Sequence, residues 1–136
     1  MTENEIASRV LDAAFAVHTK LGPGLLESVY EVVLAYELKK RDPMAERQKS
    51  MPIVYDNIRF DEAFRSDLVV NGKVIAESKS VETLLPLHAK QLLTQLRLSG
   101  LKLGLLINFG EVHLKNGIRR VINGYLDAKD SAEFSL

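Results

Sequence analysis

The first third of the chain is patterned for helices. Apolar residues recur at intervals of three and four from the N-terminus, a spacing that gives a helix one apolar stripe. The stripe consists of Ile6, Val10, Ala13, Val17 and Leu21. Thr2 and Glu5 have the spacing of a capping box, and the Gly22-Pro23-Gly24 segment would end the helix. A second helix is expected over residues 26–40, where Asp42-Pro43 stops the pattern.

The rest of the chain is patterned for strands around a third helix. That helix is expected over residues 87–98, with Gly100 as its C-terminal stop. The expected strands cover residues 47–55, 64–70, 73–80, 103–109, 112–115 and 118–122. The run over 103–109 is almost wholly apolar, which predicts a central strand buried on both faces. The last two strands would form a hairpin around Asn116-Gly117. This order predicts an α/β or α+β fold, a mixed sheet flanked by helices.

Composition narrows the class of protein. The 136 residues, 46% hydrophobic and 26% charged, suit one globular domain over residues 1–136, with a frayed tail from about residue 128. The sequence has no cysteine, which excludes disulfides and thiolate zinc sites and fits the cytoplasm. No apolar run approaches the roughly 20 residues of a membrane span, and the acidic N-terminus is unlike a signal peptide. We therefore expect no membrane partner.

The formal net charge of zero bears on nucleic-acid binding. Proteins that bind nucleic acid tightly and without sequence preference usually carry a basic balance or a basic patch. The equal numbers of basic and acidic residues count against such a binder. They do not exclude an enzyme that needs only a local basic groove.

Candidate chemistry gathers around two expected strands. Asp67 ends the Arg65-Ser66-Asp67 segment, and Glu77-Ser78-Lys79 follows after the Asn71-Gly72 turn. The two carboxylates can hold a hard divalent cation through oxygen. Lys79, two residues beyond Glu77, projects from the same strand face and can position a water or neutralise charge on a phosphate. This set is typical of a magnesium-dependent phosphodiesterase. The alternative is a charge pair on a surface strand.

The site hypothesis makes a demand on the turn. With a two-residue loop, Asp67 would lie opposite Ala76, and Glu77 would face away. A three-residue loop brings Asp67 and Glu77 to one face, with Gly72 as the left-handed residue of a type I turn plus bulge. The sequence therefore predicts a bulged or three-residue turn. The face opposite the site would carry Leu68, Val70, Val74 and Ala76.

Two of the expected helices carry further polar candidates. Glu27 is either an acid that complements the helix dipole or a member of the site, and the two roles are compatible. Tyr30 shares its helix face and is expected to pack with its hydroxyl bonded, although it is also a candidate for substrate contact. His88, Gln91 and Gln95 fall on one face of the third helix. For His88, a hydrogen bond to a substrate phosphate or to Glu77 is favoured over a metal bond, because magnesium prefers oxygen.

Four ordered motifs resemble a known family. They are Gly24-Leu25-Leu26-Glu27-Ser28-Val29-Tyr30, Asp67 with Glu77-x-Lys79, Leu87-His88-Ala89-Lys90-Gln91-Leu92-Leu93, and Gly104-Leu105-Leu106-Ile107-Asn108-Phe109-Gly110. Together they resemble the GxxExxY family of small bacterial proteins in the PD-(D/E)xK nuclease superfamily, over about residues 5 to 125. The chain departs from the family pattern at Ser66, Ser78 and Gln95, which leaves the chemical positions intact.

The resemblance implies a restriction-endonuclease-like fold and roles for individual residues. Asp67, Glu77 and the Ser78 carbonyl would bind Mg²⁺ or Mn²⁺, and Lys79 would act on the attacking water or the phosphate. Glu27 would hold a metal-bound water or a second ion, and Gln91 would support the site from the later helix.

These expectations lead to a divalent-metal-dependent nuclease that acts on DNA or RNA. The alternative is a non-catalytic nucleic-acid-binding or regulatory module on the same fold, favoured by the zero net charge and small size. A third possibility is a component of a larger complex, and homodimerisation would suit an enzyme that cuts two strands.

Overall fold

The computed structural model of the chain describes residues 1–126. The helices are α1 (Glu3–Leu21), α2 (Glu27–Lys39), α3 (Pro86–Ser99) and a short 3-10 helix, η1 (Leu114–Gly117). The strands are β1 (Ala45–Tyr55), β2 (Ile58–Val70), β3 (Val74–Lys79), β4 (Leu103–Asn108) and β5 (Ile118–Ile122). None of the helices described is long and apolar enough to cross a membrane.

The strands of residues 1–126 form one five-stranded sheet in the order β1-β2-β3-β4-β5. β3 and β4 run parallel and are connected through α3, whereas the other neighbouring pairs are antiparallel. Every residue of β4 is buried, which confirms the prediction of an interior strand covered on both faces. The architecture is the expected α+β mixed sheet flanked by helices, consistent with a restriction-endonuclease-like fold.

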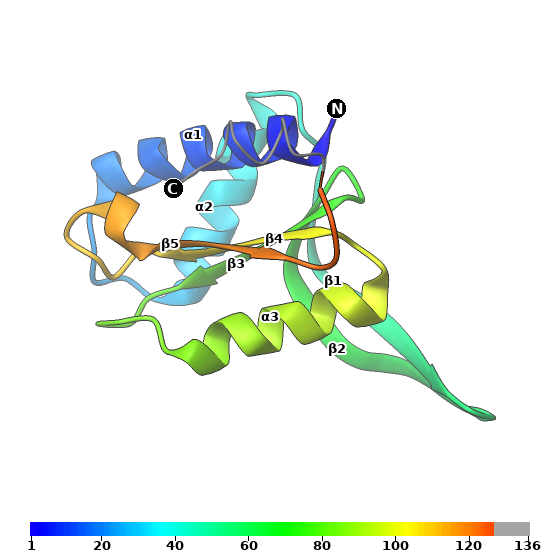
Figure 1. Ribbon diagram of the computed structural model, residues 1–136. Coiled ribbons are helices and arrows are strands. Elements are labelled where there is room, and N and C mark those ends of the chain that lie inside the picture. The colour runs from blue at the N-terminus through cyan, green and yellow to red at the C-terminus, as the bar shows by residue number, and fades with distance from the viewer. Residues whose placement is uncertain (127–136) are drawn as a thin grey trace.

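The helices cover the sheet on both faces, with α1 and α2 on one side and α3 on the other (Figure 1). Alternate residues of the strands therefore enter two separate cores. The α1/α2 side includes Leu68, Val70, Val74 and Ala76, as predicted, together with Ile6, Val10, Leu34 and Leu38. The α3 side includes Met51, Val69, Ile75, Leu92, Leu96 and Leu106.

The helix ends follow the signals in the sequence. The Thr2 hydroxyl oxygen accepts a hydrogen bond from the Glu5 N–H at 3.1 Å, which confirms the N-cap. Gly22 ends α1 with a φ of 70°, and Gly100 ends α3 in the left-handed conformation. Leu21 is the last residue of α1, as the stripe predicts, but it is 40% exposed, so the stripe is buried only as far as Val17.

The loop between β2 and β3 has the predicted length. Val70 pairs with Val74, so Asn71, Gly72 and Lys73 form a three-residue loop. The predicted turn type was wrong. Asn71 and Gly72 both have positive φ, at 51° and 65°, as in a type I′ turn, and Lys73 is the extra residue. The Lys73 N–H closes the turn on the Val70 carbonyl at 3.0 Å.

The predicted hairpin over residues 112–122 was wrong in its first half. Residues 114–117 form η1, and only β5 is a strand, paired with β4. Two contacts account for the difference. His18 Nε2 lies 2.7 Å from the Glu111 carbonyl oxygen, which ties this segment to α1. Gly117 approaches β4 so closely that an added Cβ would lie 2.7 Å from the Asn108 carbonyl oxygen.

β2 begins six residues earlier than predicted, at Ile58. The additional residues pair only with β1, and the two strands extend as a ribbon away from the helices and the rest of the sheet (Figure 1). Residues 54–63 of this ribbon are all exposed, so burial imposes no clear pattern on their sequence. The predicted frayed tail from about residue 128 lies outside the described residues.

Candidate active site

The candidate site lies where β2 and β3 separate. The two strands pair from Val70–Val74 to Leu68–Ala76, and no pair follows in the described ladder. Asp67 is the next residue of β2, and Glu77 the next of β3. The Asp67 carboxylate accepts a hydrogen bond from the Ser78 N–H at 3.1 Å. The Asp67 N–H donates to Glu77 Oε1 at 3.4 Å. The two acidic side chains thus fill the fork between the strands.

The fork opens on the sheet face that α3 covers. Val69 and Ile75 enter the α3-side core, and Asp67 and Glu77 lie two residues further along the same strands. This agrees with the sequence analysis, which required Asp67 and Glu77 to share one face. The three-residue loop is the cause, because a loop shorter by one residue would have turned Glu77 into the apolar core under α1 and α2.

Glu77 has an unusual electrostatic environment. Its side chain is buried, with 7% of the residue exposed. Burial, followed by the negative charge of Asp67, raises the pKa of Glu77 from 4.5 to about 8, while the Asp67 N–H and the Lys79 charge act in the opposite direction. A buried carboxyl beside a second carboxylate is costly to ionise, so the pair favours a bound proton or a bound cation.

Lys79 is half-buried at the C-terminal end of β3, two residues beyond Glu77. Its backbone is held by the Phe109 N–H, which donates to the Lys79 carbonyl at 2.8 Å. The buried Asn108 side chain continues this support. Its Oδ1 accepts from the Val81 N–H at 3.0 Å, and its Nδ2 donates to the Val81 carbonyl at 2.9 Å. The end of β3 that carries Lys79 is therefore anchored to β4.

The residues in the fork fit a magnesium-type cation. Asp67 and Glu77 supply carboxylate oxygens. Burial and the Asp67 charge raise the pKa of Glu77 because they disfavour its ionised form, and a bound divalent cation would stabilise that form. No group of three or more His, Cys, Asp or Glu side chains within residues 1–126 forms a complete cage. Magnesium does not require one, because it is usually held by one or two carboxylates together with waters and substrate phosphates.

Two of the expected site residues lie at the rim. Glu27 is the exposed first residue of α2. The loop before it is tied to the end of β3, because the Ser80 hydroxyl donates to the Leu25 carbonyl at 2.6 Å. Glu27 is therefore at the Lys79 end of the sheet, but it makes no hydrogen bond to the fork among the described residues. Gln91 is exposed on α3 and likewise makes none.

Tyr30 and His88 are engaged in local structure. Tyr30 is fully buried, stacks on Phe109 with ring centroids 4.5 Å apart, and donates its hydroxyl proton to the Gly22 carbonyl at 2.5 Å. A side chain with no exposed surface offers nothing to a substrate, so the expected substrate contact by Tyr30 is without support. The His88 Nδ1 accepts a hydrogen bond from the Leu85 N–H at 3.0 Å and caps α3, instead of contacting Glu77.

Gln95 is the residue of α3 that reaches the fork. Its Oε1 accepts a hydrogen bond from the Ser66 hydroxyl at 3.1 Å, next to Asp67 in sequence. Ser66 and Gln95, two of the three positions at which a departure from the family pattern is expected, are thus bonded to each other. The contact between them joins α3 to β2.

The sequence analysis missed residues on the opposite side of β2. Glu31 of α2 is buried with 4% exposed, although it carries a charge. Its carboxylate accepts from Arg47 at 2.9 and 3.1 Å and from Gln48 Nε2 at 2.6 Å, both in β1. Glu31 could have been recognised from its position four residues after Glu27, which places both side chains on the same helix face.

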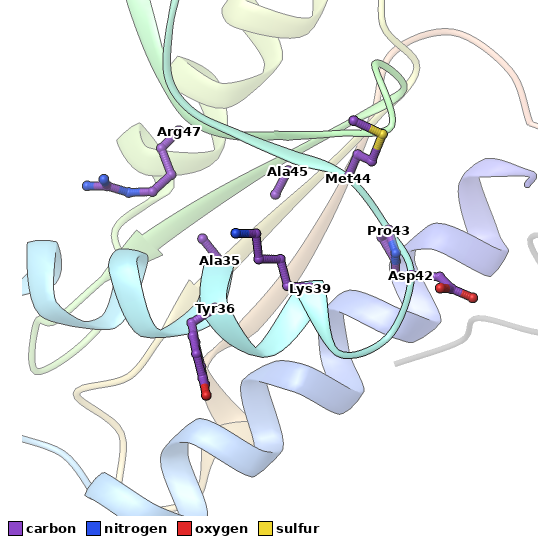
Figure 2. Close-up of a pocket in the computed structure, with 8 residues that line it drawn as sticks. All are labelled: Ala35, Tyr36, Lys39, Asp42, Pro43, Met44, Ala45 and Arg47. Carbon is purple, nitrogen blue, oxygen red and sulfur yellow. The ribbon is translucent and has the colours of Figure 1, made fainter.

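The cavity drawn in Figure 2 is separate from the fork. It has a volume of about 510 Å³ and lies between the C-terminal half of α2 and the start of β1. Its lining includes Tyr36, Lys39 and Arg47, but neither carboxylate of the fork. The lining holds a single acidic residue, Asp42, whereas the fork brings two carboxylates together, so the fork is the better candidate for a metal site.

Comparison with known proteins gives one match. Residues 4–121 match the family model described as the PD-(D/E)XK nuclease superfamily. No curated protein and no solved structure gives a significant match to the chain. The matched span includes the fork and all the helices and strands that flank it.

Proposed function

This chain belongs to the PD-(D/E)XK nuclease superfamily, and on that premise we propose that it is a divalent-metal-dependent nuclease that hydrolyses phosphodiester bonds in DNA or RNA. The observation that carries the proposal is the fork between β2 and β3. There Asp67 and Glu77 face each other, and burial together with mutual repulsion raises the pKa of Glu77 to about 8. Such a pair is expected at a cation site.

Each residue of the fork has a separate role in this proposal. Asp67, Glu77 and the Ser78 carbonyl would hold Mg²⁺ or Mn²⁺. When bound, the cation would supply an activated water and stabilise charge on the phosphate. Lys79 would orient the water or hold the phosphate, and the anchoring of its backbone by Phe109 keeps it beside Glu77. Glu27 and Gln91, at the rim, would act on substrate or on a second water. His88 and Gln95 would line the approach along α3.

Within the superfamily, we propose that the chain is a member of the GxxExxY family. The support is the Gly24-to-Tyr30 motif, in which Gly24 has a φ of 106° that favours glycine and Tyr30 bonds back to the same loop. A cytoplasmic location is part of the same proposal, because the sequence has no cysteine.

The alternative function is a non-catalytic nucleic-acid-binding or regulatory module. The observation in its favour is that several basic side chains are already paired with acids, which leaves less positive charge for phosphates. The pairs are Lys40 and Arg41 with Glu37, Arg47 with Glu31, Arg59 with Asp61, and Arg65 with Glu62.

The test is cleavage of labelled single- and double-stranded DNA and RNA with Mg²⁺, Mn²⁺ or EDTA. We expect metal-dependent cleavage that Lys79→Ala abolishes while Lys49→Ala, on the edge strand, leaves it unchanged. Calorimetry with Mn²⁺ accompanies the assay. If the wild-type protein neither cleaves nucleic acid nor binds Mn²⁺, the nuclease proposal is wrong and the non-catalytic module is favoured. Binding without cleavage would mean a competent site that lacks its substrate or partner.

We also propose a homodimer, in which two copies could cut two strands. The support is the outer ribbon, where Ile53, Tyr55, Ile58 and Phe60 share one face by cross-strand pairing and the last three are more than half exposed. Sedimentation equilibrium of wild type and of Tyr55→Ser/Phe60→Ser tests this. A monomeric wild type at assay concentration contradicts it.

A further inference from the structure

β1 interrupts its pairing with β2 at one position beside the fork. The ladder pairs Arg47 with Leu68 and Lys49 with Ser66, but it omits the intervening pair of Gln48 and Asp67. Gln48 has a φ of 51°, in the left-handed region. A residue other than glycine is strained in such a conformation when its surroundings hold it there. The interruption therefore has a cost that another interaction must offset.

The interruption changes where the Asp67 N–H points. Upstream, the Asn71 N–H donates to the Met44 carbonyl at 2.8 Å. Hydrogen-bonded pairs recur at every second residue of an antiparallel ladder, so Gln48 and Asp67 occupy a hydrogen-bonding position. A regular β1 would take the Asp67 N–H for its own ladder. In this structure that pair is missing from the ladder, and the Asp67 N–H donates to Glu77 Oε1 at 3.4 Å.

The same interruption changes which way the side chains of β2 face. Val69 and Phe64 both contact the α3-side core, although they are five positions apart in the strand. Regular alternation would send them to opposite faces, so the alternation breaks between them. As a result Ser66 reaches Gln95 on α3, while the adjacent Asp67 lies in the fork.

Glu31 holds the interruption in place. Its Oε1 accepts from Gln48 Nε2 at 2.6 Å, and its Oε2 accepts from Arg47 at 2.9 and 3.1 Å. The Glu31 carboxylate is buried, and charged hydrogen bonds of this kind are among the stronger ones in proteins. Through Glu31, α2 therefore binds two successive residues of β1, at and next to the position opposite Asp67. This contact is called the Glu31 grip below.

We propose that Gln48, held by Glu31, is a positioning residue for the fork. Its left-handed backbone lies opposite Asp67, whose N–H donates to Glu77, and it lets Ser66 turn toward α3 beside Asp67. The geometry stands on the contacts above, while its consequence for metal binding rests on the proposed function. Neither Gln48 nor Glu31 touches the cation or substrate.

A pair of variants tests the backbone role. Gln48→Gly keeps the left-handed conformation without strain, whereas Gln48→Ala removes the grip of Glu31 and leaves a residue that prefers regular β structure. We expect the Asp67 amide in ¹⁵N-¹H spectra, recorded in EDTA, to shift in Gln48→Ala and to remain near its wild-type position in Gln48→Gly. Mn²⁺ affinity by calorimetry should fall about tenfold in Gln48→Ala and stay within about twofold in Gln48→Gly.

A second pair keeps the test decisive if Gln48→Ala does not fold. Glu31→Ala should shift the Asp67 amide, and Glu31→Ala/Gln48→Gly should restore it, because glycine needs no grip. An Asp67 amide that does not respond to loss of the grip, or that shifts equally in the glycine variant, overturns the proposal. Wild type that binds no Mn²⁺ would count against the nuclease alone, since the amide comparison is independent of metal.

Discussion

The two halves of β2 differ in their surroundings. Its inner half, Asp67–Val70, lies between β1 and β3, and Leu68 and Val70 have no exposed surface. Its outer half, from Ile58 to Arg65, pairs only with β1, and Phe60 is 52% exposed. Asp67 lies at the boundary between them. The same strand is thus a core element at one end and a surface ribbon at the other.

The boundary explains why a polar site can exist inside a buried sheet. Beyond Ala76, β3 has lost β2 as a backbone partner, so the Ser78 N–H needs another acceptor. The Asp67 carboxylate meets that need at 3.1 Å. The packed inner half holds Asp67 in position, while the divergence of the outer half opens space for a ligand. The comparison teaches that position along the strand, more than residue type, decides what an aspartate does here.

The largest difference in cleavage rate should appear when the two aspartates of β2 are replaced by asparagine, one at a time. Asp67→Asn should reduce cleavage by more than the roughly 100- to 1,000-fold that loss of a single oxyanion-hole donor costs. Asp61→Asn in the outer half removes the same charge from the same strand and should leave the rate unchanged, because Asp61 is exposed and pairs with Arg59 of the same strand. Initial rates on the preferred substrate measure both. If the cleavage rate falls equally in the two variants, the two halves of β2 do not differ in function.

The next effect concerns stability against pH. The pKa of Glu77 is raised in the folded state from 4.5 to about 8, so the folded protein holds a proton that the unfolded chain releases. Stability in EDTA should therefore fall as the pH rises from 4.5 to 8, by as much as about 4 kcal/mol at 1.36 kcal/mol per pKa unit. Glu77→Gln should remove most of that dependence. Urea unfolding at pH 5, 7 and 9 compares the two proteins, and parallel curves would contradict the burial argument.

A third effect compares apolar residues of the two halves. Leu68→Ala should lower the free energy of unfolding by about 2–5 kcal/mol, because it leaves a cavity in the α1/α2-side core. Phe60→Ala should cost less than about 1 kcal/mol, since the ring is half exposed. Urea midpoints at the protein concentration of the cleavage assay measure both. A large loss for Phe60→Ala would mean that the ribbon is covered, and would then favour the homodimer.

The smallest effect should come from the ion pairs of the ribbon. Arg65 lies 3.5 Å from Glu62, and both side chains are more than half exposed. Arg65→Ala should change stability by less than about 0.5 kcal/mol, and the change should vanish in 1 M NaCl. A clearly larger loss of cleavage in Arg65→Ala, with stability unchanged, would assign Arg65 to substrate phosphate.

Local patterns were sufficient for part of the site. The Asn71-Gly72 turn and the period of two along each strand predicted that Asp67 and Glu77 share a face, and the three-residue loop confirms it. The roles of His88 and Gln95 could not be read in this way. Both lie on one face of α3, yet His88 caps its own helix and Gln95 bonds Ser66. Spacing along a helix identifies a shared face, but not the partner opposite it.

The sequence by itself determined the helices, the buried strand β4, the family resemblance and the pairing of Asp67 with Glu77. These depend on neighbours within a few residues, or on a turn whose length sets the register. Only the tertiary structure decided the burial of Glu77, the grip of Glu31 on Gln48 and the replacement of a predicted strand by η1. Each of these depends on contacts between segments far apart in the chain, and local periodicity carries no information about them.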